Sequence, residues 1–165
     1  MTRWKIVLLL TLFAHSSFAD NVPYNQAKKN GIQKCLPAVQ KLSEFLHDGQ
    51  NHGAHSIWAT HNPDKQMFTS TIERTYSDGA QIMSLFVAPV TSGACATAYE
   101  RIGYWDKSCL ALAKDTFADF EYKGELNKFV TYLSKKSGGG SAYLMTAGSG
   151  CIAVRKETIT DGNNP

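Results

Sequence analysis

Apolar side chains recur at intervals of three and four along residues 32–46, a spacing that places them on one face of a helix. They are Ile32, Cys35, Leu36, Val39, Leu42, Phe45 and Leu46. Proline is tolerated only in the first turn of a helix or at a kink. Because Pro37 falls within the pattern, the sequence predicts a secure helix over 36–47. The preceding segment, 20–30, is polar, and we expect it to be loosely held.

Strand patterns follow this helix. Segments that alternate between apolar and polar residues, or are apolar throughout, indicate β-strands. They are expected at 56–60, 67–76, 81–88 and 95–105. The pair Asp78-Gly79 suits the left-handed positions of a tight hairpin turn. The 81–88 segment is apolar on both faces, as a central strand is. The four segments predict an antiparallel meander.

A second helix and further strands are expected after residue 105. Ser108 is a typical N-cap, and apolar residues follow it at helical spacing. Residues 125–136 fit either a helix or a strand, and their content of strand-forming residues favours a strand. A glycine-rich loop over 137–141 leads to a closing hairpin formed by 142–146 and 151–156.

The resulting fold class is α+β, with antiparallel meanders flanked by two helices in the order α-ββββ-α-βββ. Each half is a helix followed by a meander, which suggests a duplicated plan. The tail 158–165 is expected to be loose.

The first residues resemble an export signal in their three-part layout. A basic start with Arg3 and Lys5 precedes the apolar run 6–14. A membrane anchor is the less favoured alternative, because a spanning helix needs about twenty apolar residues. Small residues, Ser17 and Ala19, stand three and one before a cut after Ala19. The pattern predicts a signal peptide over 1–19 and one globular domain over 20–165, periplasmic or secreted, without stable membrane insertion.

Four cysteines remain after that cut: Cys35, Cys95, Cys109 and Cys151. An even number in an exported domain indicates two disulfides. A structural zinc site is less favoured, because no two of these cysteines have the close spacing that such sites use. A bond between Cys95 and Cys109 would have to close a strand of about 33 Å, far beyond the reach of a disulfide. Of the two remaining connectivities, we favour Cys35–Cys95 with Cys109–Cys151.

Charge gives little support to nucleic-acid binding. The formal charge is +3 for the whole chain, and loss of Arg3 and Lys5 lowers it by two, to +1. A nearly neutral domain lacks the basic footprint that nucleic acids or anionic lipids require. No nucleic-acid partner is therefore expected.

Histidines form the most suggestive cluster for chemistry. Residues 47–64 contain His47, His52, His55 and His61, together with Asp64. Neutral imidazoles are common ligands of transition metals. However, their spacing matches no rigid pair on a single element, and solvated loop residues are the more favoured interpretation. A metal-binding protein that uses this segment is one alternative function.

Cys109 offers a second alternative, because a thiol at a helix N-terminus is favoured as a thiolate. A thiol hydrolase with a histidine base can be drawn, although it would leave one cysteine unpaired. Aromatic residues gather around the second helix, and core packing explains them better than an interface does. They are Tyr99, Tyr104, Trp105, Phe117, Phe120 and Tyr122.

No cofactor motif and no catalytic set is evident. The favoured interpretation is therefore an exported, disulfide-stabilised binding or accessory protein. It could be an inhibitor or immunity-type protein whose partner is another extracytoplasmic protein.

Overall fold

The computed structural model describes residues 20–77 and 79–159. Helices α1 (Val22–Lys29) and α2 (Leu36–His47) come first. Four strands follow, with a short 3-10 turn, η1 (Pro63–Lys65), after the first of them: β1 (His52–Trp58), β2 (Phe68–Tyr76), β3 (Gly79–Pro89) and β4 (Cys95–Trp105). Helix α3 (Cys109–Asp115) then precedes four more strands: β5 (Phe120–Glu125), β6 (Val130–Lys135), β7 (Gly140–Ala147) and β8 (Gly150–Ile159).

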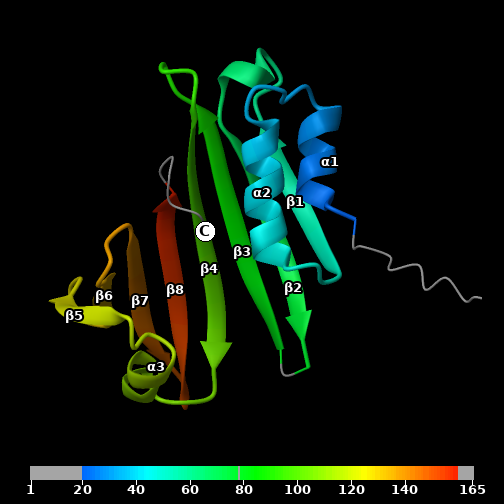
Figure 1. Ribbon diagram of the computed structural model, residues 1–165. Helices are drawn as coiled ribbons and strands as arrows, with labels where there is room; N and C mark the ends of the chain where they lie inside the picture. Colours follow the sequence, from blue (N-terminus) through cyan, green and yellow to red (C-terminus); the bar gives the residue numbers. More distant parts are fainter. Residues whose placement is uncertain (1–19, 78, 160–165) are drawn as a thin grey trace, which may run out of the picture.

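All eight strands form one antiparallel sheet in the order β1-β2-β3-β4-β8-β7-β6-β5 (Figure 1). Each half of the chain contributes a four-stranded meander, and the last strands of the two meanders, β4 and β8, pair with each other. The expected plan of a helix followed by a meander is thus present twice. The two halves are arranged tail to tail about the β4–β8 pair.

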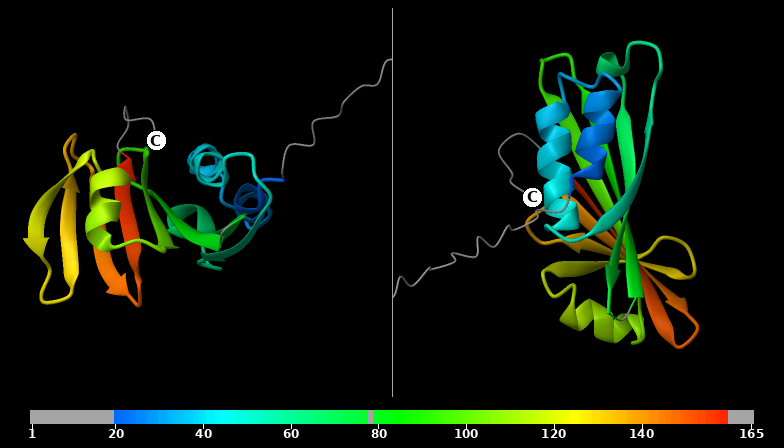
Figure 2. Two further views of the ribbon diagram at one scale, coloured as in Figure 1. Left: turned by 90° about the horizontal axis from the view of Figure 1, so that it is seen from below. Right: turned by 90° about the vertical axis from the view of Figure 1, so that its right-hand side faces the viewer.

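The three helices lie on the same face of this twisted sheet (Figure 2). Side chains six residues apart on a strand point to the same face. On β4, Tyr99 belongs to the core beneath α2, and Trp105 packs against the core beneath α3. The opposite face carries no helix in the described part of the chain, and we call it the open face.

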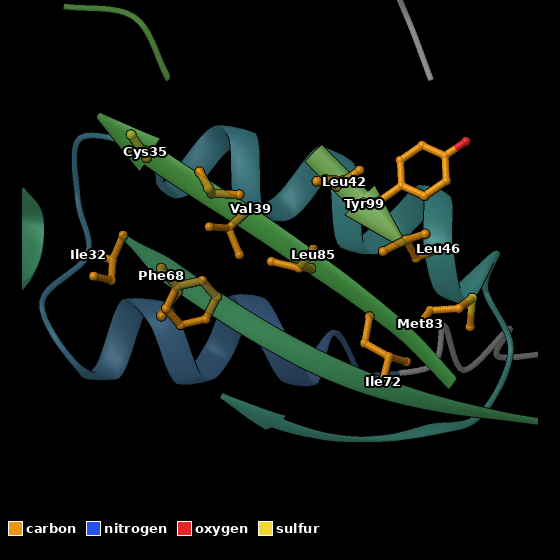
Figure 3. Packing of buried hydrophobic residues seen from close by; sticks show 12 residues of the cluster. Ile32, Cys35, Val39, Leu42, Leu46, Phe68, Ile72, Met83, Leu85 and Tyr99 are labelled. Atoms are coloured by element: carbon orange, nitrogen blue, oxygen red, sulfur yellow. The ribbon is translucent and has the colours of Figure 1, made fainter. Parts of the chain in front are cut away.

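Two separate hydrophobic cores fill the helix-covered face. The first lies between α1, α2 and strands β2–β4, where Phe68, Ile72 and Leu85 are almost fully buried (Figure 3). The second lies between α3 and strands β6–β8, and includes Leu112 and Leu144. The helix predicted from the amphipathic pattern of residues 32–46 is therefore confirmed, and its apolar face supplies much of the first core.

Each core is tied by one disulfide. Cys35, at the N-cap of α2, is bonded to Cys95 at the start of β4, with their Cα atoms 5.8 Å apart. Cys109, the first residue of α3, is bonded to Cys151 in β8, with a Cα separation of 5.0 Å. The structure thus has the connectivity that the sequence favours. Disulfides of this kind are typical of oxidising, extracytoplasmic compartments.

The expectation that 20–30 is loosely held is wrong, because this segment forms α1. The Asn21 side chain caps the helix by accepting a hydrogen bond from the Tyr24 backbone N–H at 3.1 Å. Pro23 lies in the first turn, where proline is well tolerated. Ala27 is fully buried against the first core. One small alanine is enough for close packing but is too weak a signal for a periodicity argument.

The second meander has four strands where the sequence predicted three. The missed strand, β5, is mostly exposed and contains Gly124 at a bulge in its pairing with β6. The ambiguous segment 125–136 does contain a strand, β6. In the first half, β1 begins at His52, four residues earlier than expected. β8 extends to Ile159, whereas residues 160–165 of the expected loose tail lie outside the described residues.

The predicted signal peptide, residues 1–19, also lies outside the described residues. Within the described part, none of the helices combines the length and the apolar character that crossing a membrane demands.

Candidate functional site

The open face of the sheet carries large apolar side chains in two rows that cross the strands. The longer row joins five strands through directly paired residues: Ile82, Ile102, Val154, Tyr143 and Tyr132. The shorter row lies two residues further along: Tyr104, Ile152, Met145 and Val130. Ile82 is 50% exposed and Tyr104 is 54% exposed. Water therefore reaches a broad apolar surface at the centre of the molecule.

Contacts with neighbouring residues hold several of these side chains in place. The rings of Tyr132 and Tyr143 stack with their centroids 5.6 Å apart. Gly150 allows the Tyr104 ring to lie across β8, because a Cβ on Gly150 would stand 2.4 Å from the tyrosine oxygen. Aromatic residues and methionine are enriched in protein interfaces, where they bring large contact areas at low entropic cost.

A polar row borders the apolar rows and lines a hollow of about 460 Å³. At its centre, Lys156 on β8 forms an ion pair of 2.7 Å with Glu100 on β4. This hydrogen bond raises the pKa of the Lys156 ammonium group. Ser134 and Ser141 extend the row on β6 and β7. The open face thus has an apolar centre with a polar, concave margin.

The helix-covered face has a charged seam between its two cores. Arg101 on β4 and Arg155 on β8 are directly paired across the strands, although like charges in such positions repel each other. Glu157 neutralises Arg155, whose Nε donates to Oε1 at 2.6 Å, and also pairs with Lys135 at 2.9 Å. Burial opposes the ionisation of Glu157, yet the hydrogen bonds from Lys135 and Arg155 lower the pKa of its carboxyl group.

The four histidines do not form the metal site that the sequence suggested as an alternative. His47 and His52 stack with centroids 4.3 Å apart. His55 and His61 are exposed and do not join them. Asp64 has a structural role, since its Oδ1 accepts hydrogen bonds from the backbone N–H groups of Gln33 and Lys34. No group of three possible metal ligands converges anywhere in residues 20–77 and 79–159.

The stacked pair should make stability depend on pH. Burial, followed by the nearby charge of His52, lowers the pKa of His47. The unfolded chain then binds a proton more readily than the folded protein as pH falls below about 6.5. We expect the free energy of unfolding, measured by urea titration, to decrease between pH 7.5 and 5.5. His47→Gln should flatten this decrease, whereas the exposed-site control His55→Gln should retain it; equal slopes in both variants would contradict the assignment.

Cys109 does not offer a catalytic thiol, because its sulfur is bonded to that of Cys151. The thiol hydrolase alternative is therefore contradicted in the oxidised protein. Cys109 has a structural role instead, because its disulfide ties the start of α3 to β8. Ser108 caps the same helix end by accepting a hydrogen bond from the Ala111 backbone N–H at 3.3 Å.

The aromatic residues around α3 divide between the core and the surface. Tyr99, Phe117 and Phe120 are buried, and Trp105 packs against the second core. Tyr104 and Tyr122 are exposed. The preference for core packing is right for the first four residues, whereas Tyr104 belongs to the open face.

Most residues of the open face were not identified as functional from the sequence. One signal was present, since the segment 81–88 was recognised as apolar on both faces. A strand of this kind is usually buried on both sides, and β3 is covered only on one. No protein-family model, curated protein or solved structure matches this chain at a significant level.

Proposed function

We propose that the protein is an exported binding protein, periplasmic or secreted after removal of residues 1–19, and that its open face contacts another folded extracytoplasmic protein. An inhibitor, immunity-type or accessory role fits this description. This proposal rests on one observation: exposed apolar side chains lie on a sheet face that no described element covers. Large exposed apolar patches of this kind mark interaction sites in soluble proteins.

The extent of the surface favours a protein partner over a small ligand. The longer apolar row crosses five strands, which at about 4.8 Å between neighbours spans about 19 Å. That width suits an interface of about 800 Å² on each partner. The Lys156–Glu100 pair and the serines beside it supply the polar rim that such interfaces have.

Two substitutions on the exposed parts of the surface test the proposal. Ile82→Asp and Tyr104→Asp, made together, place two carboxylates within the apolar rows at sites where the side chains are already half exposed. A charge buried without a partner at an interface is costly. We expect affinity for the partner to fall at least thirty-fold, equivalent to about 2 kcal/mol.

The partner is first isolated from the extracytoplasmic fraction of the source cells with the mature protein, and its affinity for each variant is then measured by calorimetry. Leu110→Asp is the matched control, because Leu110 is an exposed apolar residue, 68% accessible, on α3 over the opposite face. It should bind like the wild type. Equal affinity of the double variant and the wild type, with both folded by circular dichroism, would refute the role of the open face.

A further inference from the structure

We propose that the seam between the two cores is a binding site for a small organic carboxylate. The site lies on the helix-covered face and is independent of the open face. A cavity of about 130 Å³ opens there, over strands β3, β4 and β8 and beside the end of α3. Its lining combines two cations, two aromatic rings and small polar groups: Arg101, Arg155, Trp105, Phe117, Gln81 and Thr116, with Ala153 at its floor.

Arg101 is the cation that lacks a counter-ion. Within the described residues it forms no ion pair, and its hydrogen bond is a long one, 3.4 Å from Nη2 to the Phe45 carbonyl oxygen. Its Nε is buried and has no hydrogen-bond partner in this part of the chain. Buried polar atoms in folded proteins are rarely left without a partner. An anion bound in the cavity that Arg101 lines would compensate this charge.

The charges of the seam favour an anionic ligand. Glu157 pairs with both Arg155 and Lys135, so that the seam keeps a net positive charge, and Arg101 has no ion-pair partner among the described residues. Burial lowers the pKa of the Arg101 guanidinium, because loss of surrounding water disfavours the charged form. An anion between the paired arginines would offset both this burial and their mutual repulsion.

The geometry of the site is preorganised. The Arg101 guanidinium lies over the Phe45 ring at 4.6 Å and over the Tyr99 ring at 5.5 Å, which holds its planar group in place. The Trp105 indole lies flat across Gly103, where a Cβ would stand 2.7 Å from the ring. A planar guanidinium suits the two oxygens of a carboxylate. The apolar walls, Trp105 and Phe117, favour an organic acid over a fully hydrated inorganic anion.

Benzoate is the probe for the test, because it combines a carboxylate with a flat apolar group. The mature protein carrying Trp58→Phe retains one tryptophan, Trp105 in the cavity wall. At constant ionic strength, benzoate should change its fluorescence in a saturable way, with a Kd of about 1 mM or lower. Benzamide, which has the same shape without the charge, should produce no saturable change.

Paired variants locate the site. Arg101→Gln should weaken benzoate binding at least ten-fold. Lys41→Gln removes an exposed cation of α2 that does not line the cavity, and should leave binding unchanged. A response that survives in Arg101→Gln, or that is absent from the folded parent protein, would overturn the proposal. So would competition by inorganic phosphate as strong as that by benzoate, because the site would then bind anions in general.

Discussion

Replacing Cys35 and Cys95 together by alanine should lower the free energy of unfolding by about 4 kcal/mol. The two residues are 60 positions apart, and an unfolded chain without the bond gains the conformational freedom of that loop. Typical domains are stable by only about 5–15 kcal/mol. The variant should therefore unfold at a much lower urea concentration than the wild type, as measured by circular dichroism.

The second disulfide gives an internal comparison for this result. Cys109 and Cys151 close a loop of 42 residues. Replacing both by alanine should also lower the free energy of unfolding by about 4 kcal/mol, because the stabilisation by a disulfide grows only with the logarithm of loop length. Alanine is used at all four positions because Cys35 and Cys151 are buried, where a serine hydroxyl would add its own cost. A loss below 1 kcal/mol in either pair would show that the bond does not constrain the unfolded chain as argued.

Leu112→Ala should destabilise the protein by about 3 kcal/mol. Leu112 is fully buried at the centre of the smaller core, where it lies among Phe117, Leu144 and Ala153. Its loss removes apolar contacts and leaves a cavity that cannot easily close, because the disulfide Cys109–Cys151 ties the short helix α3 to β8. The urea midpoint of the variant, compared with that of the wild type, measures the effect.

Leu110→Ala is the control for this prediction. It makes the same chemical change two residues away on the same helix, at a side chain that is 68% exposed. We expect a change within about 0.5 kcal/mol. Equal effects of the two variants would mean that α3 is not packed as the structure describes.

The tryptophans can also report whether the two cores unfold together. Trp58 packs against the first core and Trp105 against the second. β4 and β8 pair over nine residues between them, so a break in one core should weaken the other. In single-tryptophan versions of Leu112→Ala, both residues should report the same shifted midpoint.

Strong periodicity and covalent geometry were enough to predict the framework of the fold. The helix over 36–47 has the bounds expected from its apolar spacing, and the strand 95–105 agrees with β4 residue for residue. The length of that strand excluded a bond between Cys95 and Cys109, and the favoured one of the two remaining pairings is the one that the structure has. These features are fixed by local patterns, or by a distance that a rigid element cannot shorten.

Features that depend on tertiary contacts were missed. α1 is held by a capping asparagine and by two buried residues, Pro23 and Ala27, and β5 is held at the sheet edge by pairing with β6. Neither carries an apolar periodicity of its own. In both cases neighbouring elements stabilise a segment whose own sequence signals a loop.

The candidate sites were missed for a different reason. Arg101 and Arg155 are 54 positions apart and come together only because β4 pairs with β8, which no local pattern predicts. The apolar residues of the open face are individually ordinary. Their significance comes from the register, which aligns them in rows across strands from both halves of the chain.

The strand order also determines how this molecule can associate with copies of itself. Among the strands of residues 20–77 and 79–159, β1 and β5 are the two with an unpaired side. The bulge at Gly124 interrupts the hydrogen-bonding ladder of β5, and such irregularities block the addition of a further strand. β1 pairs with β2 without interruption over seven residues, and the Gln26 side-chain amide on α1 donates a hydrogen bond to the Ala54 carbonyl oxygen of this strand. Addition of a strand is therefore expected at β1 and not at β5, which allows two molecules to join through their β1 strands but allows no continuous fibre.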